Sequence, residues 1–94
     1  MLTLEIKDKV VLVTGSNRGI GKSFVEKALE LGAAKVYATA RSTDSLADLA
    51  AANPERVVLL NLDICNQEQV DAVSAAAQDV DVLINNAGAG GGGA

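Results

Sequence analysis

A run of glycines and small polar residues, Thr14-Gly15-Ser16-Asn17-Arg18-Gly19-Ile20-Gly21, lies directly behind the apolar run Val10 to Val13. Glycines in such a turn remove the Cβ atoms that would block close approach of the backbone to a ligand. A helix that begins within the run presents free N–H groups and roughly half a positive charge. We therefore expect an anion site here, suited to a nucleotide pyrophosphate. The alternative is an ordinary turn, because glycines also close loops that bind nothing, and the spacing Gly-x-x-x-Gly-x-Gly departs from the Gly-x-Gly-x-x-Gly fingerprint.

The elements that must position this turn are an alternation of short β-branched runs and amphipathic stretches from Lys9 onward. That alternation predicts an α/β fold of three layers, with helices on both faces of a parallel sheet. The four strands are expected at Val10 to Thr14, Lys35 to Ala40, Val57 to Leu62 and Asp81 to Asn85. Right-handed crossovers then predict the strand order 3-2-1-4. The ligand crevice of such a sheet lies at the carboxyl ends of strands 1 and 4.

Three helices are predicted between these strands. The first spans Gly19 to Leu31 and is expected to bury Ile20, Phe24, Ala28 and Leu31, with Gly32 in the left-handed closing position. The second is shorter, begins behind a cap at Ser42, Thr43 or Asp44, buries Leu46, Leu49 and Ala50, and ends at Pro54. The third begins near Asn66, is capped by Asn66 or Asp63, and packs Val70, Val73 and Ala77.

Composition limits the classes of function. The 94 residues make one small domain with a net charge of −4 and no cluster of basic residues, which argues against nucleic acid as a partner. There is no histidine, so the commonest general base and metal ligand is missing, and no metal site is expected. The single cysteine, Cys65, excludes an intrachain disulfide and is expected to be a small buried residue. Without a signal sequence or a long apolar run, we expect a cytoplasmic protein with no membrane partner.

Three motifs occur in order along the chain: Thr14-Gly15-x-x-x-Gly19-Ile20-Gly21, then Asp63 after the third strand, then Asn85-Asn86-Ala87-Gly88 after the fourth. Together they resemble the N-terminal half of a short-chain dehydrogenase/reductase, over nearly the whole chain. The resemblance implies a Rossmann fold that binds NAD(P). The cofactor-binding residues that it implies are Gly15, Ser16, Asn17, Arg18, Gly19, Ile20 and Gly21 at the pyrophosphate and adenosine ribose, Asp63 and Ile64 at the adenine, and Asn86, Ala87 and Gly88 near the nicotinamide ribose. Asp63 could instead be a helix cap or a turn carboxylate, and Asn85 and Asn86 could simply end a strand.

Charge predicts the cofactor. A carboxylate after the second strand suits the 2′-hydroxyl of NAD, whereas a guanidinium suits the 2′-phosphate of NADP. Arg41 ends the second strand where that carboxylate would stand, Ser42 follows as a donor, and Arg18 lies in the glycine turn. We therefore predict NADP over NAD. The alternative is a solvated strand end at Arg41 and a turn residue at Arg18.

No catalytic residue is assigned. The family resembled here uses a serine and a Tyr-x-x-x-Lys pair as proton donor and oxyanion stabiliser, and neither follows Gly88. Tyr37 has Arg41 four residues later, but four residues of a strand span about 13 Å, so the two side chains cannot act together as they would on a helix. We assign Tyr37 to the core or to a face of the sheet.

These observations leave three hypotheses. In the first, the chain is the NADP-binding portion of an oxidoreductase without its catalytic half. In the second, it is a stand-alone nucleotide-binding or scaffold module, natural or engineered. In the third, it is a subunit that takes its missing strands from a partner. A long apolar edge at the fourth strand predicts self-association, or pairing with a C-terminal half. Residues 1–88 form the binding domain in this interpretation, and residues 89–94 a glycine-rich flexible tail or an artificial end.

Overall fold

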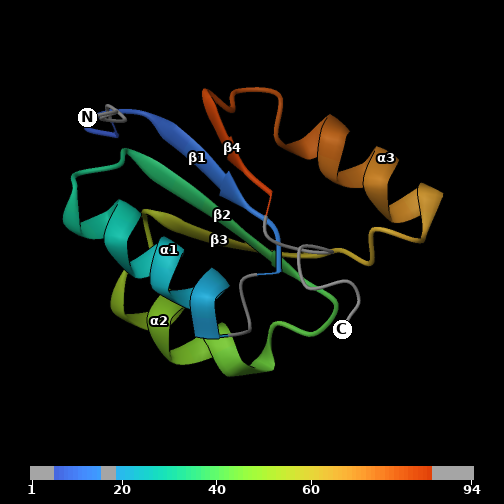
Figure 1. Ribbon diagram of the computed structural model, residues 1–94, viewed down its shortest axis with the longest axis horizontal. Coiled ribbons are helices and arrows are strands. Elements are labelled where there is room, and N and C mark those ends of the chain that lie inside the picture. Colours follow the sequence, from blue (N-terminus) through green and yellow to red (C-terminus); the bar gives the residue numbers. More distant parts are fainter. Residues whose placement is uncertain (1–5, 16–18, 86–94) are drawn as a thin grey trace.

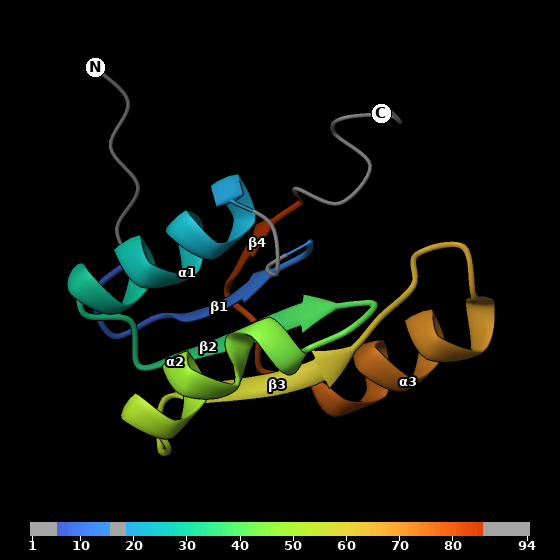
Figure 2. The ribbon, with the colours of Figure 1, turned by 90° about the horizontal axis from the view of Figure 1, so that it is seen from below.

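The computed structural model describes residues 6–15 and 19–85 of the chain (Figure 1). The predicted tail at 89–94 therefore lies outside the described residues. Four parallel strands form one sheet in the order β3-β2-β1-β4, as predicted (Figure 2). Their bounds are Val10–Val13 for β1, Lys35–Ala40 for β2, Val57–Asn61 for β3 and Val82–Ile84 for β4.

The helices lie on both faces of this sheet. They are α1 at Gly19–Glu30, a 3-10 turn at Asp44–Leu46 that leads into α2 at Ala47–Ala52, and α3 at Gln67–Ala76. Helices α1 and α2 cover one face and α3 the other (Figure 1). This arrangement follows from right-handed crossovers, because the chain moves from β1 to β3 in one direction and then back across the sheet to β4.

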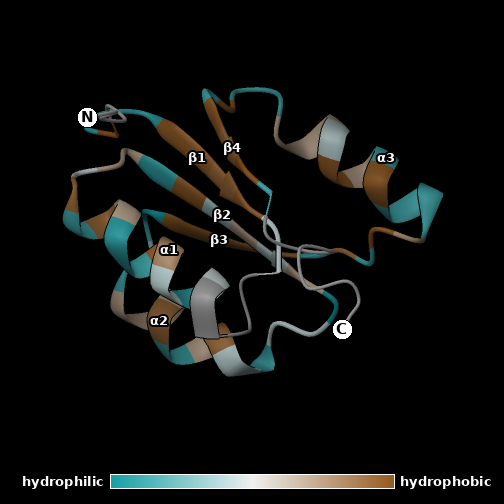
Figure 3. Ribbon diagram, in the orientation of Figure 1, coloured by the Kyte–Doolittle hydropathy of each residue, from teal (hydrophilic) through white to brown (hydrophobic). Residues whose placement is uncertain are grey.

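Alternate strand residues build two cores, one on each face. Val11 and Val13 point toward α1 and α2, whereas Leu12 between them joins the cluster beneath α3. The strands are accordingly the most apolar part of the chain (Figure 3). Both faces of a parallel sheet must be covered, and the near-continuous apolar runs of the sequence reflect this requirement.

The face of α1 that packs on the sheet differs from the prediction. Ala28 is buried as expected, but Phe24 and Leu31 are 38% and 46% exposed, so their assignment to the core is wrong. The buried stripe instead contains Gly21, Val25 and Ala28, at positions i, i+4 and i+7. These smaller side chains allow the helix to approach the sheet closely, which the larger Phe24 would prevent.

Several local predictions are confirmed. Gly32 has a φ of +91° and closes α1, with its N–H donating to the Leu29 carbonyl at 3.1 Å. Leu46 is fully buried. Asn66 caps α3, because its Oδ1 accepts from the Gln69 N–H at 3.2 Å. The 3-10 turn before α2 begins without a side-chain cap at Thr43, which was one of the three predicted cap residues.

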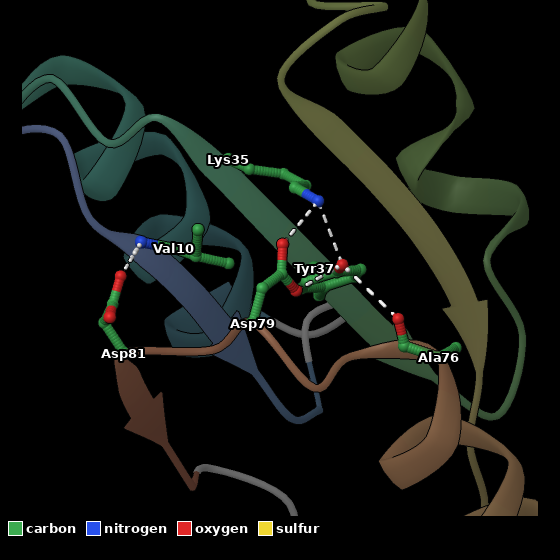
Figure 4. A network of polar contacts seen from close by, with 6 residues as sticks. All are labelled: Val10, Lys35, Tyr37, Ala76, Asp79 and Asp81. Carbon is green, nitrogen blue, oxygen red and sulfur yellow. Dashed lines mark hydrogen bonds and ion pairs between the residues drawn. The ribbon is translucent and has the colours of Figure 1, made fainter.

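Tyr37 belongs to the core beneath α3, as predicted, and its hydroxyl anchors a polar network at the amino end of β2 (Figure 4). The hydroxyl donates to Asp79 Oδ1 at 2.7 Å, and Lys35 Nζ donates to Asp79 Oδ2 at 2.8 Å. The hydrogen bond from Lys35 and the second from Tyr37 lower the pKa of Asp79. The pKa of Lys35 is raised, mainly by its hydrogen bond to Asp79 and to a lesser extent by its hydrogen bond to Tyr37. The network ties the α3–β4 connection to β2.

Candidate functional site

The carboxyl ends of the strands meet at one edge of the sheet, at the lower right of Figure 1. Gly15 follows β1, Arg41 follows β2, Asp63 follows β3 and Asn85 follows β4. Because all four strands are parallel, the sheet brings these positions, which span 70 residues of sequence, to the same edge. The strand order reverses between β1 and β4, so the switch point lies where the glycine turn leaves the sheet.

Gly15 is the part of the glycine turn that lies within the described residues before α1. Gly15 has a φ of +65°, a left-handed conformation that glycine adopts without the steric cost a Cβ atom would bring. Helix α1 then begins at Gly19, and no acidic side chain lies in its first turn. The first turn of α1 therefore carries no carboxylate that would compete with an anion for the positive end of the helix dipole.

Thr14 joins the two strands that flank the switch point. Its backbone N–H donates to the Ile84 carbonyl at 3.0 Å, and its hydroxyl donates to Asn85 Oδ1 at 3.0 Å. Asn85 thus follows the end of β4, in agreement with the alternative that this residue simply ends a strand, and its side chain also connects that end to β1. These two bonds tie the carboxyl ends of β1 and β4 together at the switch point.

Six of the fourteen predicted binding residues cannot be placed. Ser16, Asn17, Arg18, Asn86, Ala87 and Gly88 lie outside the described residues. Gly19 and Ile20 form the start of α1, and only their backbone is described. Gly21 lies within α1 and is buried against the sheet, so it serves the packing of the helix.

Arg41 and Ser42 are exposed at the end of β2, at the same edge as the glycine turn. The carbonyl of Arg41 accepts a hydrogen bond from Asn61 Nδ2 at 3.2 Å. The hydrogen bond from Asn61 to Arg41 is a contact that the sequence analysis did not predict. A polar residue at the end of a strand gives no local sign that its side chain will reach across to the neighbouring strand.

Asp63 and Ile64 follow β3, and Ile64 is 48% exposed. Asp63 Oδ1 accepts from the Cys65 N–H at 2.9 Å, so the alternative assignment as a turn carboxylate agrees with the structure. The Asp63 N–H in turn donates to Gln69 Oε1 at 2.7 Å, a second contact that the sequence did not reveal. Cys65 is exposed in this turn, so its prediction as a buried residue is wrong. The residue lies beyond the sheet, where neither face covers it.

An open apolar groove of about 390 Å³ lies on the α3 face, beside β4. Its apolar lining comes from Leu12, Leu62, Ile64, Val70, Val73 and Leu83. Leu83 is 62% exposed although it lies in the middle of a strand. The prediction of a long apolar edge needs correction, because β4 has only three residues. The exposed apolar surface beside β4 is therefore this groove, of which Leu83 is a part, rather than a long strand edge.

The described part of the chain offers neither a metal cluster nor a membrane-spanning helix. Within it, no three histidine, cysteine, aspartate or glutamate side chains are grouped so that they could hold a metal ion. None of its helices has the length and apolar character needed to cross a membrane. The cytoplasmic location stays a prediction.

Comparison with known proteins identifies the family of this chain. The family model described as short chain dehydrogenase matches residues 9–94. The chain belongs to the short chain dehydrogenase family. The 3-oxoacyl-[acyl-carrier-protein] reductase FabG of Vibrio cholerae is 39% identical over 89 residues, which are 90% of this chain and 36% of the relative. The NAD-dependent glycerol dehydrogenase of Listeria innocua is 39% identical over 88 residues, which are 88% of this chain and 34% of the relative.

The solved structures agree with the predicted Rossmann-like fold. A short chain dehydrogenase from Burkholderia cenocepacia in complex with NADP matches with a TM-score of 0.80 and 43% identity, over 89% of this chain and 34% of that protein. The chain spans about a third of the length of the relatives it matches. The activities of those proteins are therefore properties of much longer chains.

Proposed function

We propose that this chain binds NADP(H) along the carboxyl edge of its sheet. The observation that carries the proposal is the glycine turn at the switch point. There, Gly15 adopts a left-handed backbone and α1 starts with no acidic residue in its first turn. A dinucleotide pyrophosphate fits this arrangement because the helix N-terminus supplies donors and partial positive charge. Gly15, Gly19 and Ile20, with Ser16, Asn17 and Arg18, would hold the pyrophosphate and the adenosine ribose.

The preference for NADP rests on charge. Arg41 and Ser42 are exposed at the edge where the adenosine ribose would lie, and an arginine there favours a 2′-phosphate. A structural relative from Burkholderia cenocepacia was solved with NADP, which supports this choice. The Listeria innocua relative is named as NAD-dependent, so the family alone does not settle the preference. Asp63 and Ile64 would contact the adenine, and Asn86, Ala87 and Gly88 the nicotinamide ribose.

Bound NADPH supplies a hydride for reduction of a carbonyl group. These 94 residues contain no Tyr-x-x-x-Lys sequence to supply a proton. Tyr37 is committed to Asp79 and Lys35 at the amino edge, opposite the binding edge. We therefore expect these residues by themselves to bind the cofactor without turnover. A stand-alone binding or scaffold module would also bind the cofactor without turnover. It would differ only in not being part of a larger enzyme.

The decisive experiment is a titration of the chain with NADPH and NADH, followed by nicotinamide fluorescence. Wild type is expected to bind NADPH more tightly, and Arg41→Asp should reverse the preference because a carboxylate repels the 2′-phosphate and accepts from the 2′-hydroxyl. Lys7→Asp is the matched control, since it makes the same charge change at an exposed position before β1. An unchanged preference in Arg41→Asp would defeat the assignment, and turnover of an added carbonyl substrate by this chain would defeat the non-catalytic interpretation.

We also propose that the apolar groove and Leu83 make the chain associate, either with itself or with the C-terminal part of a longer protein. The exposure of Leu83 beside the groove supports this proposal. Sedimentation should show a concentration-dependent dimer that Leu83→Lys weakens. Phe24→Lys is the matched control, because Phe24 is also exposed but lies on α1, across the sheet. A wild-type chain that stays monomeric at high concentration would contradict self-association.

A further inference from the structure

The side chain of Asn61 continues the pairing of β2 and β3 beyond the end of the strands. Asn61 is the last residue of β3 and is paired in register with Ala40, the last residue of β2. The backbone N–H of Leu62 donates to the Ala40 carbonyl at 2.7 Å. The next carbonyl along, that of Arg41, accepts instead from Asn61 Nδ2 at 3.2 Å. A side-chain amide thus holds the first residue after β2, where the chain leaves the sheet.

The segment that follows Arg41 is also held at its other end. Leu46, the last residue of the 3-10 turn, is fully buried in the core on the α1 and α2 face of the sheet, and its N–H donates to the Thr43 carbonyl at 3.0 Å. Between these two anchors the side chains of Arg41 and Ser42 are exposed. Two exposed donors on a short segment fixed at both ends lose less conformational freedom on binding a ligand than the same donors on a free loop.

We propose that Asn61 is a positioning residue that sets the selectivity of this edge for a 2′-phosphate over a 2′-hydroxyl. It acts through Arg41, by fixing the backbone from which the guanidinium extends, and it touches no part of the nucleotide itself. The inference rests on the proposed NADP binding. The effect of Asn61 is confined to the phosphorylated cofactor. The pyrophosphate site, which both cofactors would use, lies at the glycine turn on β1 and α1, away from Asn61.

The magnitude follows from the kind of bond. A neutral amide-to-carbonyl hydrogen bond between exposed residues contributes modestly, so loss of Asn61 is expected to weaken NADP⁺ binding about three- to tenfold. Binding of NAD⁺ should change less than twofold, because it does not need the guanidinium. The ratio of the two dissociation constants, rather than either one alone, is therefore the readout.

The experiment measures dissociation constants of NADP⁺ and NAD⁺ by calorimetry for the whole chain and for four variants: Asn61→Ala, Arg41→Ala, the double variant and Asn53→Ala. Asn53→Ala is the matched control, because Asn53 Nδ2 also donates to a backbone carbonyl, that of Leu49, at 3.0 Å, but at the end of α2. Asn61→Ala should lower the NADP⁺ preference and Asn53→Ala should not. In the Arg41→Ala background, loss of Asn61 should have no further effect on the ratio.

Two results would overturn the inference while leaving NADP binding intact. One is an unchanged ratio of the dissociation constants in Asn61→Ala, which includes an equal loss for both cofactors. The other is the same change of the ratio when Asn61 is removed in the Arg41→Ala background. A wild-type chain that does not bind NADP⁺ refutes the proposed function, and one that binds both cofactors equally refutes the proposed preference for NADP; either result removes the basis of the inference before any variant is measured. Asn61→Leu, which keeps the side-chain shape without a donor, repeats the test should the alanine variant fail to show a wild-type melting transition.

Discussion

Arg56 is expected to hold the far end of the helix whose beginning forms the anion site. It lies directly before β3, and one of its terminal nitrogens donates to the carbonyls of Leu29 at 2.9 Å and Ala33 at 2.8 Å. Its Nε donates to Ala33 at 3.1 Å. Leu29 lies in the last turn of α1 and Ala33 just beyond its end, so the guanidinium adds a donor to the Leu29 carbonyl, which also accepts from the Gly32 N–H, and ties the end of the helix to the segment that follows it. Its positive charge also complements the helix dipole.

The size of the effect can be worked out from these contacts. Hydrogen bonds to a charged group contribute about 1.5–3 kcal/mol each, and the partial exposure of Arg56 reduces this, so we expect about 2 kcal/mol for the whole cluster. A chain of 94 residues has a free energy of unfolding of about 5–14 kcal/mol. With an unfolding entropy of about 0.2 kcal/mol per kelvin for this length, the loss lowers the melting temperature by about 10 °C.

The assay is urea unfolding followed by circular dichroism. Arg56→Met keeps the aliphatic stem and should lose the full amount, whereas Arg56→Lys keeps the charge without the planar fork and should lose about half. Glu55→Gln, a change at the exposed neighbouring residue, is the control and should leave the midpoint unchanged. An Arg56→Met midpoint equal to that of wild type would refute the assignment of Arg56 as a clamp on α1.

Other predictions concern the core, the end of α1 and pH. Leu46→Ala should cost about 2–4 kcal/mol in urea unfolding, because Leu46 is fully buried. Gly32→Ala should cost about 1–2 kcal/mol in the same assay, from its φ of +91° rather than from crowding, since an added Cβ would meet Lys7 Cγ at 3.5 Å. The lowered pKa of Asp79 means that its stabilisation is present above its ordinary pKa of 3.8 and is lost as pH falls through the lower, folded-state value. The raised pKa of Lys35 means that its share is present below 10.5 and is lost as pH rises through the higher, folded-state value. Urea midpoints of wild type and Asp79→Asn should therefore differ at neutral pH and converge in strong acid, and a constant difference across the acid range would contradict this.

The confirmed predictions are those that depend on local pattern and chirality. The strand runs, the closing Gly32 and the cap at Asn66 each follow from residues close together in sequence. Strand order then follows from the handedness of crossovers, which depends on no particular side chain. The error in α1 has a different cause. Its helical period was recognised, but a helix with apolar residues on adjoining stripes does not reveal which stripe meets the sheet, and Val25 rather than Phe24 does so.

The sequence by itself determined a parallel α/β sheet with a glycine turn at its switch point, because periodicity, turn chemistry and chirality act over short distances along the chain. Only the tertiary structure decided which side chains hold the edge in place. Asn61 reaches Arg41 across 20 residues, and Arg56 reaches Leu29 across 27. Such contacts depend on strand register and on the final separation of packed layers. The register and the separation of the layers depend on the packing of the whole core, so they cannot be predicted from any short segment of the sequence.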